Sequence, residues 1–152
     1  MSIIATDLDG TIFKGQTLID GVKEGLLKII NEGIEIYYTT NNSSQTPSEI
    51  KDKLENLLQF DIDISKIITP LVIFQNLYSD DKLNIFIYGS ENLKKYIKNL
   101  NMNVTSLENA ELVLIGRKEE NNFSEINEII KSVSIGKNLS LIHISEPTRP
   151  YS

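Results

Sequence analysis

The fold of this chain is decided by the segment Ile3-Ile4-Ala5-Thr6-Asp7-Leu8-Asp9-Gly10-Thr11. Its apolar, β-branched first half predicts a buried strand. The strand stops at two aspartates spaced i, i+2, and a glycine turn follows at once, which places Asp7 and Asp9 at the carboxyl edge of a sheet. Open α/β folds bind their ligands at this edge. Because side chains alternate along an extended strand, both carboxylates could serve one site.

After this segment the chain alternates predicted helices and strands. Thr46-Pro47-Ser48-Glu49 is a capping box with proline at N1, and Asp20 is expected to cap the preceding helix. Phe13 lies in a loop and is expected to be exposed. The resulting β-α-β-α-β-α order implies parallel strands joined by right-handed crossovers. The elements expected up to residue 80 are a helix over 20–33, a strand over 34–38, a helix over 46–58, a strand over 65–69 and a helix over 70–78.

A second α/β unit is expected after the break at Asp80-Asp81-Lys82. Ser90 and Ser124 are the expected N-caps of its two helices. The chain contains no repeat of fixed period, and no low-complexity linker separates its halves. We place the domain boundary near residue 80, which gives two domains, 1–80 and 81–138. The elements expected in this unit are a strand over 84–88, a helix over 90–100, a strand over 111–115 and a helix over 124–133.

Composition limits the possible functions. The 152 residues are 40% hydrophobic and 24% charged, as in an ordinary soluble domain. A net charge of −6 argues against a nucleic-acid or anionic-membrane binder, which needs a basic face. The lack of cysteine excludes disulfides, thiolate nucleophiles and zinc–thiolate sites. No apolar run approaches the ~20 residues of a membrane span and no signal-peptide pattern precedes the first strand, so a cytoplasmic location is expected.

The last residues differ in composition from the rest of the chain. They contain the only histidine, His143, and two of the four prolines. This string resembles translated sequencing-adapter sequence, and such scars are left out of reasoning about fold and site. The alternative is an ordinary C-terminal strand, because residues 139–144 are apolar enough to form one. We expect residues 139–152 to be a non-native tail, and the natural protein to continue differently after about Asn138.

Without His143 the chain contains no histidine, which excludes a Ser-His-Asp triad and histidine-based metal sites. Neither the P-loop pattern nor the dinucleotide-binding glycine pattern occurs. The remaining chemistry is that of carboxylates, hydroxyls, amides and lysines. Hard oxygen ligands of this kind suit Mg²⁺, which commonly bridges one or two carboxylates to a substrate phosphate.

Two motifs carry a family resemblance. Asp7-Leu8-Asp9-Gly10-Thr11, directly after an apolar strand, resembles the first motif of the haloacid dehalogenase (HAD) superfamily. Thr40-Asn41, after the next strand, resembles its second motif. The run over residues 38–47, together with Asp20-Gly21-Val22 and Ile68-Thr69-Pro70, is similar to class IIA of the superfamily, which contains NagD-type and p-nitrophenyl-phosphatase-type enzymes.

The resemblance extends from Ile3 to about Asn138 and implies a fold. Residues 1–80 would form the N-terminal part of a Rossmann-like parallel sheet, the HAD core. Residues 81–138 would form the first part of an α/β cap domain. The third-motif lysine and the fourth-motif acidic cluster of the superfamily are not found in this chain, so we expect the 152-residue polypeptide to be inactive or nearly so. We also expect it to be marginally folded, because strand edges that would pair with missing strands stay exposed.

The resemblance also implies a reaction: Mg²⁺-dependent hydrolysis of a phosphomonoester through an aspartyl-phosphate intermediate. Asp7 would be the nucleophile, and Asp9 the general acid and base. Asp7 and the backbone carbonyl of Asp9 would bind Mg²⁺, which offsets the repulsion between the two reacting anions. Thr40, Asn41 and Gly10 would bind the phosphate, Gly10 by letting backbone amides approach it closely.

Other interpretations remain open at this level. A receiver-like phosphoacceptor also uses aspartates and Mg²⁺, but its phosphorylated aspartate follows the third strand, where Ile67-Ile68-Thr69 contains none. A non-catalytic binding module is the other alternative. Asn42, Ser43 and Ser44 are expected to be loop hydrogen-bonding residues. The expected partner is a small phosphorylated metabolite, and its identity and the oligomeric state stay open.

Overall fold

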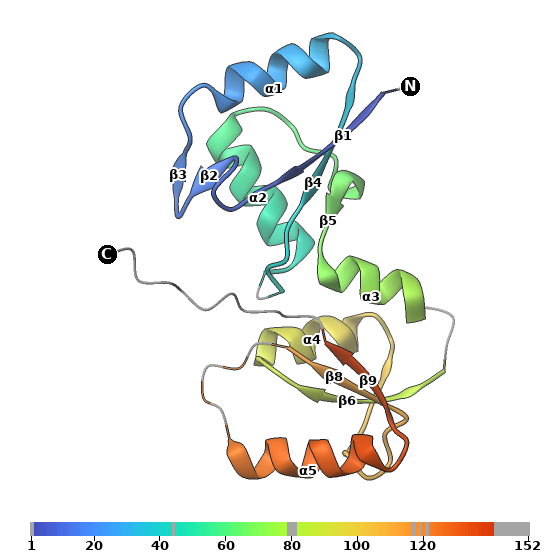
Figure 1. Cartoon of the computed structure of the whole chain (residues 1–152). Coiled ribbons are helices and arrows are strands. Elements are labelled where there is room, and N and C mark those ends of the chain that lie inside the picture. Colours follow the sequence, from blue (N-terminus) through green and yellow to red (C-terminus); the bar gives the residue numbers. More distant parts are fainter. Residues whose placement is uncertain are drawn as a thin grey trace. The chain divides into compact units, whose positions relative to one another are not determined.

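The computed structural model describes residues 2–43, 45–78, 82–116, 118, 120 and 122–141. The chain divides into two compact units, residues 1–73 (unit 1) and 74–152 (unit 2) (Figure 1). The division falls inside helix α3 (Pro70–Tyr78), a few residues before the boundary expected near residue 80. Among the described residues, no helix is long and apolar enough to cross a membrane.

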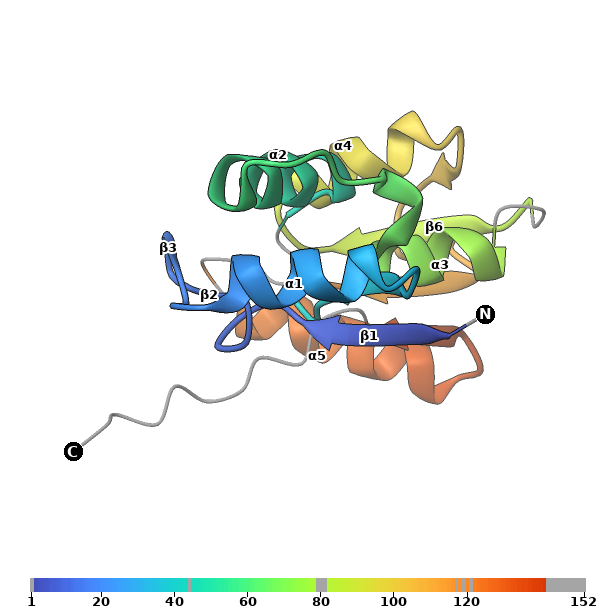
Figure 2. The same ribbon diagram turned by 90° about the horizontal axis from the view of Figure 1, so that it is seen from above.

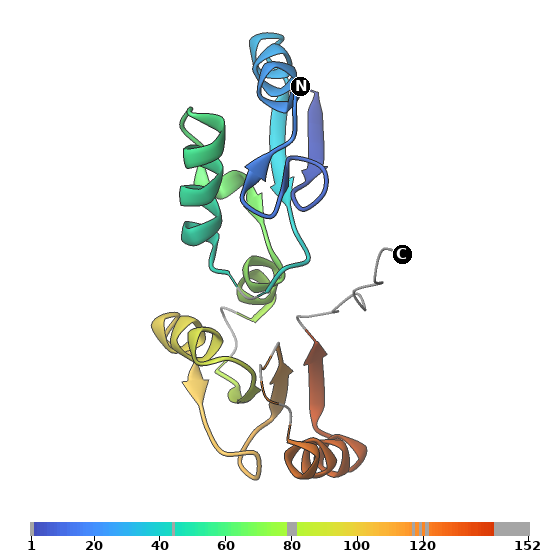
Figure 3. The ribbon, with the colours of Figure 1, turned by 90° about the vertical axis from the view of Figure 1, so that its left-hand side faces the viewer.

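Unit 1 is built on a parallel sheet with the strand order β1-β4-β5. Figure 3 shows the arrowheads of these strands pointing the same way. Helix α1 contacts β4, and α2 contacts β5 and the hairpin strand β3. The elements of unit 1 are β1 (Ile3–Asp7), β2 (Phe13–Lys14), β3 (Thr17–Leu18), α1 (Val22–Asn31), β4 (Glu35–Thr39), α2 (Pro47–Leu58), the 3₁₀ turn η1 (Ile64–Lys66) and β5 (Ile67–Ile68). The predicted order of helices and parallel strands is confirmed.

The starts of the two helices of unit 1 differ in how they are capped. The predicted capping box is present at α2, where the Thr46 side chain accepts a hydrogen bond from the Glu49 amide and the Glu49 carboxylate accepts one from the Thr46 amide. The prediction of Asp20 as the cap of α1 is wrong. Gly21 occupies that position at φ 77, without a side-chain cap bond, a left-handed conformation that glycine adopts without a steric penalty.

The core of unit 1 contains side chains that the sequence placed in a loop. Phe13 is 2% exposed, so the prediction of an exposed aromatic is wrong. The short β2–β3 hairpin carries Phe13 into the core, and the Lys53 ammonium lies 3.6 Å from the centre of its ring. The buried core cluster comprises Leu8, Ile12, Phe13, Leu26, Ile36, Tyr38, Ile50, Leu54, Leu58, Ile62 and Ile67.

Strand β1 lies at the edge of the described sheet. Within the described residues it pairs with β4 alone, and Ile3 is 59% exposed. The prediction of a buried strand is therefore wrong for β1. An apolar strand with an open edge is a surface to which another strand can add.

Unit 2 holds a second parallel sheet with the strand order β7-β6-β8-β9. Helices α4 and α5 lie on opposite sides of it (Figures 1 and 2). Tyr88, Val113 and Ile129 are buried together on the α5 side. The elements are β6 (Asn84–Tyr88), α4 (Glu91–Asn99), β7 (Asn103–Val104), β8 (Leu112–Ile115), α5 (Phe123–Ser134) and β9 (Asn138–Leu141).

Two details of unit 2 differ from the expectations, and a third expectation, about the tail, is not tested. Asn122, not Ser124, caps α5, because its side-chain oxygen accepts hydrogen bonds from the Ser124 and Glu125 amides. The short strand β7 was not predicted. Strand β9 includes residues 139–141, as the alternative of an ordinary C-terminal strand expects. Residues 142–152 lie outside the described residues. The non-native origin of 139–152 stays a prediction.

Candidate active site

The two sequence motifs meet at one edge of the unit 1 sheet. Strands β1 and β4 run parallel, and their register aligns Asp7 with Thr39. Both strands end at these residues, so the turn after Asp7 and the loop after Thr39 leave the sheet side by side (Figure 3). The Thr39 hydroxyl also donates a hydrogen bond of 3.1 Å to the Thr6 carbonyl, which ties the strand ends together. This is the edge at which parallel α/β sheets bind ligands.

The turn after β1 holds its shape through the backbone. The Leu8 carbonyl accepts hydrogen bonds from the amides of Thr11, Ile12 and Phe13 at 3.3, 2.9 and 3.2 Å, and the Leu8 side chain is buried. Gly10 has φ 84, and its amide donates to the Phe13 carbonyl at 2.8 Å. Gly10 thus contributes its backbone conformation to the turn, while its N–H is used within the turn.

Asp7 and Asp9 flank the buried Leu8, and both are exposed. Buried Leu8 fixes the backbone between them while the two carboxylates stay accessible to solvent and to a ligand. The structure therefore brings both predicted carboxylates to one turn.

The loop after β4 contains the second motif. Thr40 is buried, and its amide donates to the Ile68 carbonyl at 3.1 Å, which ties the loop to β5. The Thr40 hydroxyl oxygen accepts a hydrogen bond of 3.1 Å from the Asn42 amide, so its own hydrogen remains free to point elsewhere. Asn41 is exposed. Asn42 thus behaves as the loop hydrogen-bonding residue that the sequence predicts.

Ser43 does not follow that prediction. Its side chain is 5% exposed, and among the described residues its hydroxyl has no hydrogen-bond partner. The expectation of a loop hydrogen bond is therefore wrong for Ser43, and Ser44 lies outside the described residues. Serine is common in polar loops, so no signal in the sequence distinguishes Ser43 from its neighbours.

The donor atoms at this edge suit a hard cation. Asp7 can offer carboxylate oxygens and Asp9 a backbone carbonyl, and Mg²⁺ is held in many sites by one or two protein oxygens plus water. Across the described ranges, no three acidic or histidine side chains cluster as a metal site. The residues present therefore fit a Mg²⁺ ion that keeps several water ligands, rather than a cation enclosed by protein.

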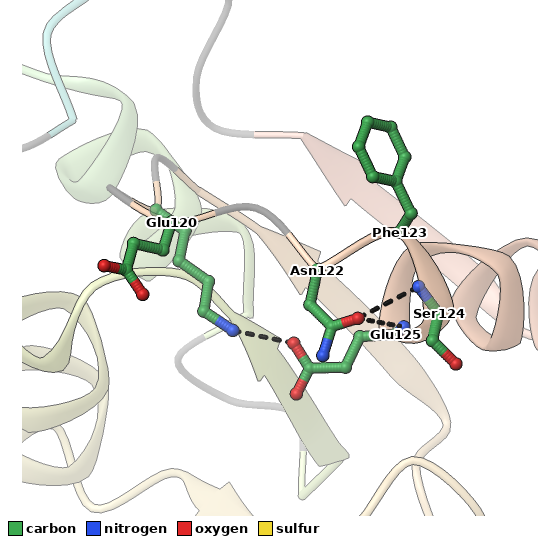
Figure 4. A pocket seen from close by; sticks show the side chains of 6 residues that line it. Glu120, Asn122, Phe123, Ser124 and Glu125 are labelled. Atoms are coloured by element: carbon green, nitrogen blue, oxygen red, sulfur yellow. Dashed lines mark hydrogen bonds and ion pairs between the residues drawn. The ribbon is translucent and has the colours of Figure 1, made fainter.

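A separate pocket lies in unit 2, at the start of α5 (Figure 4). Its volume is about 570 Å³. The Lys118 ammonium lies 2.7 Å from the Glu125 carboxylate and 4.6 Å from the centre of the Tyr88 ring, and the Glu125 interaction raises the Lys118 pKa. The Phe123 ring points away from the polar side chains (Figure 4). None of the residues predicted for the site lines this pocket, and its cation is already paired.

Known proteins resemble this chain over most of its length. The family model described as haloacid dehalogenase-like hydrolase matches residues 4–103. An acid sugar phosphatase from Staphylococcus haemolyticus is 30% identical over 122 residues, which cover 79% of this chain and 46% of that protein. The chain therefore spans about half the length of the curated relatives it matches.

Solved structures show the same fold. A p-nitrophenyl phosphatase from Archaeoglobus fulgidus aligns with a TM-score of 0.82 at 20% identity, over 93% of this chain and 54% of that one. A glycerol phosphate phosphatase from Mycobacterium tuberculosis, in complex with magnesium, aligns with a TM-score of 0.75 at 19% identity, over 95% of this chain and 44% of that one. The Rossmann-like α/β fold is thereby confirmed. Because the family model covers more than half of the sequence, the chain belongs to the haloacid dehalogenase-like hydrolases.

Proposed function

We propose that the site at Asp7 is the nucleophile half of a phosphomonoester hydrolase acting on a small phosphorylated metabolite in the cytoplasm. The observation that carries the proposal is the parallel register of Asp7 with Thr39, because it sets the two family motifs at one sheet edge. The phosphatase names of the relatives support the same reaction class. Residues 1–80 would belong to the catalytic core, and residues 81–138 to a cap that contributes to substrate choice.

In the first half of the reaction, an Asp7 carboxylate oxygen would form a bond to phosphorus while the bond to the substrate oxygen breaks. Asp9 would protonate the departing alcohol. This role needs an accessible group close to the nucleophile, and Asp9 is exposed two residues from Asp7 in the same turn. General acid catalysis of this kind contributes about 10²–10⁴ in rate.

In the second half, Asp9 would take a proton from water, and the water oxygen would attack the phosphorus of the acyl phosphate and release phosphate and Asp7. The Thr40 hydroxyl and the backbone N–H of Asn41 would hold the phosphoryl oxygens. Gly10 would let the turn approach the phosphoryl group closely. The hydrogen bond that the Thr40 hydroxyl oxygen accepts from the Asn42 amide holds this hydroxyl in place. Mg²⁺, held by Asp7 and the Asp9 carbonyl, would supply positive charge against the repulsion of the reacting anions.

We expect turnover by this chain alone to be absent or nearly so, because its described residues bring no third acidic or histidine side chain to the two aspartates. The test compares p-nitrophenyl phosphate with an alkyl phosphate such as glycerol phosphate, with Mg²⁺ and with a chelator. Asp7→Asn should abolish release from both. Asp9→Asn should slow the first, single-turnover release of alcohol from the alkyl ester far more than that of nitrophenol from the aryl ester, since nitrophenolate leaves without a proton. Release by Asp7→Asn at the wild-type rate, with both rates above that of a sample without protein, would disprove the proposal.

A further inference from the structure

We propose that the Ser43 hydroxyl is a further phosphate-binding group, which donates a hydrogen bond to an oxygen of the bound phosphoryl group. The inference rests on the proposed function, because it takes the ligand of the site at Asp7 to be a phosphoryl group. It goes beyond that function by adding a residue that neither family motif contains.

The starting observation is an uncompensated polar group. The Ser43 side chain is 5% exposed, and its hydroxyl has no partner among the described residues. Nearly all buried polar groups of native proteins are hydrogen-bonded, because burying one without a partner costs free energy. Such a hydroxyl gains a hydrogen bond when a ligand with an acceptor oxygen binds beside it.

The position of Ser43 indicates which ligand. It lies in the loop that leaves β4 at the same sheet edge as Asp7, three residues after Thr40. The amides of Thr40 and Asn42 in this loop donate to protein acceptors. The hydroxyls of Thr40 and Ser43 each carry one hydrogen that can be donated to an anion, in addition to the Asn41 backbone amide proposed above. A phosphoryl group offers several charged acceptor oxygens, and hydrogen bonds to charged groups are the stronger ones.

The loop is also suited to adapting to a ligand. Residues 40–43 belong to neither a helix nor a strand, whereas the segments on either side are fixed in β4 and by the capping box of α2. A small backbone adjustment in this short connection can bring the hydroxyl to the ligand without disturbing the sheet.

The test measures binding of orthovanadate to the full chain in the presence of Mg²⁺ by isothermal titration calorimetry. Ser43→Ala should weaken binding roughly tenfold or more, as expected for loss of a hydrogen bond to a charged group. Without vanadate, its melting temperature should be unchanged or higher, because the variant removes an unpaired buried hydroxyl. Ser48→Ala, which removes an exposed hydroxyl on the first turn of α2, is the matched control and should change neither quantity.

The outcomes separate this inference from the proposed function. If Ser43→Ala binds vanadate as tightly as wild type while Asp7→Asn or Thr40→Ala does not, the Ser43 inference fails and the proposed function stands. If wild type binds no vanadate, both fail. If Ser43→Ala does not fold, Ser43→Cys provides a side chain of similar shape with a weaker donor, and wild-type affinity in that variant would also contradict the inference.

Discussion

Replacing Thr46 by alanine tests how the loop of the candidate site is anchored. Thr46 and Glu49 make three hydrogen bonds. The Glu49 amide donates to the Thr46 hydroxyl at 3.3 Å. The Glu49 carboxylate accepts from the Thr46 amide at 2.7 Å and from the Thr46 hydroxyl at 2.9 Å. Thr46→Ala removes the two that involve the hydroxyl. Because these groups are exposed, water replaces part of the loss, and we expect a loss of about 1 kcal/mol in the free energy of unfolding.

The assay is urea denaturation followed by circular dichroism, with thermal unfolding as a second measurement. A loss of about 1 kcal/mol corresponds to a fall of roughly 4–8 °C in the melting temperature of a domain of 60–100 residues. Thr46→Ser keeps the hydroxyl oxygen and should cost much less. Thr46→Ala and Glu49→Ala should cost less together than the sum of the two single losses, since they share hydrogen bonds. Equal losses for Thr46→Ser and Thr46→Ala would refute the reasoning.

Two further predictions concern the backbone of the turn and the acid stability of unit 1. Gly10→Ala should lower the free energy of unfolding by about 1 kcal/mol, because alanine is strained at φ 84. Gly25→Ala should raise it by about 0.5–1 kcal/mol, because Gly25 lies inside α1, has no left-handed φ and has open space around it. Thermal unfolding of both variants checks this, and a stabilising Gly10→Ala would contradict it. The pKa of Glu55 is lowered first by the Ile62 amide, which donates a hydrogen bond of 2.8 Å to the carboxylate, and next by the Lys51 ammonium. The ionised Glu55 carboxylate therefore stabilises the folded state above about pH 4.3, the ordinary glutamate value, and this contribution is lost as the pH falls through the lowered pKa. Urea titrations at pH 7 and pH 3 should therefore show a smaller acid-induced loss of stability in Glu55→Gln than in wild type, and parallel losses would show that Glu55 does not contribute.

The sequence predicted the features of the fold that depend on local chemistry. The capping box at Thr46 needs only neighbouring residues, and it is present in the structure. The alternation of helices and strands also follows from periodicity, and the parallel order β1-β4-β5 agrees with it. For the same reason the site could be placed in outline, because parallel strands necessarily end at one edge and bring Asp7 to the side of Thr39.

Features that depend on tertiary contacts could not be predicted. The β2–β3 hairpin has strands of two residues each, too short for a period, and the burial of Phe13 depends on Lys53 of α2 and on the core beneath it. The chain enters α1 through a left-handed backbone conformation at Gly21, φ 77, so Gly21 and not Asp20 takes the cap position. Ser43 is distinguished from other loop serines only by what surrounds it in space.

The central claim is that Asp7 accepts the phosphoryl group, and the most direct test locates the covalent bond. The chain is incubated with p-nitrophenyl phosphate and Mg²⁺, treated with borohydride to reduce any acyl phosphate, and digested for mass spectrometry of the peptides. The account predicts reduction at Asp7 in wild type and in Asp9→Asn, in which the intermediate should accumulate, and none in Asp7→Asn. Reduction at Asp9, or an unmodified Asp7 in a sample that has released nitrophenol, would contradict it.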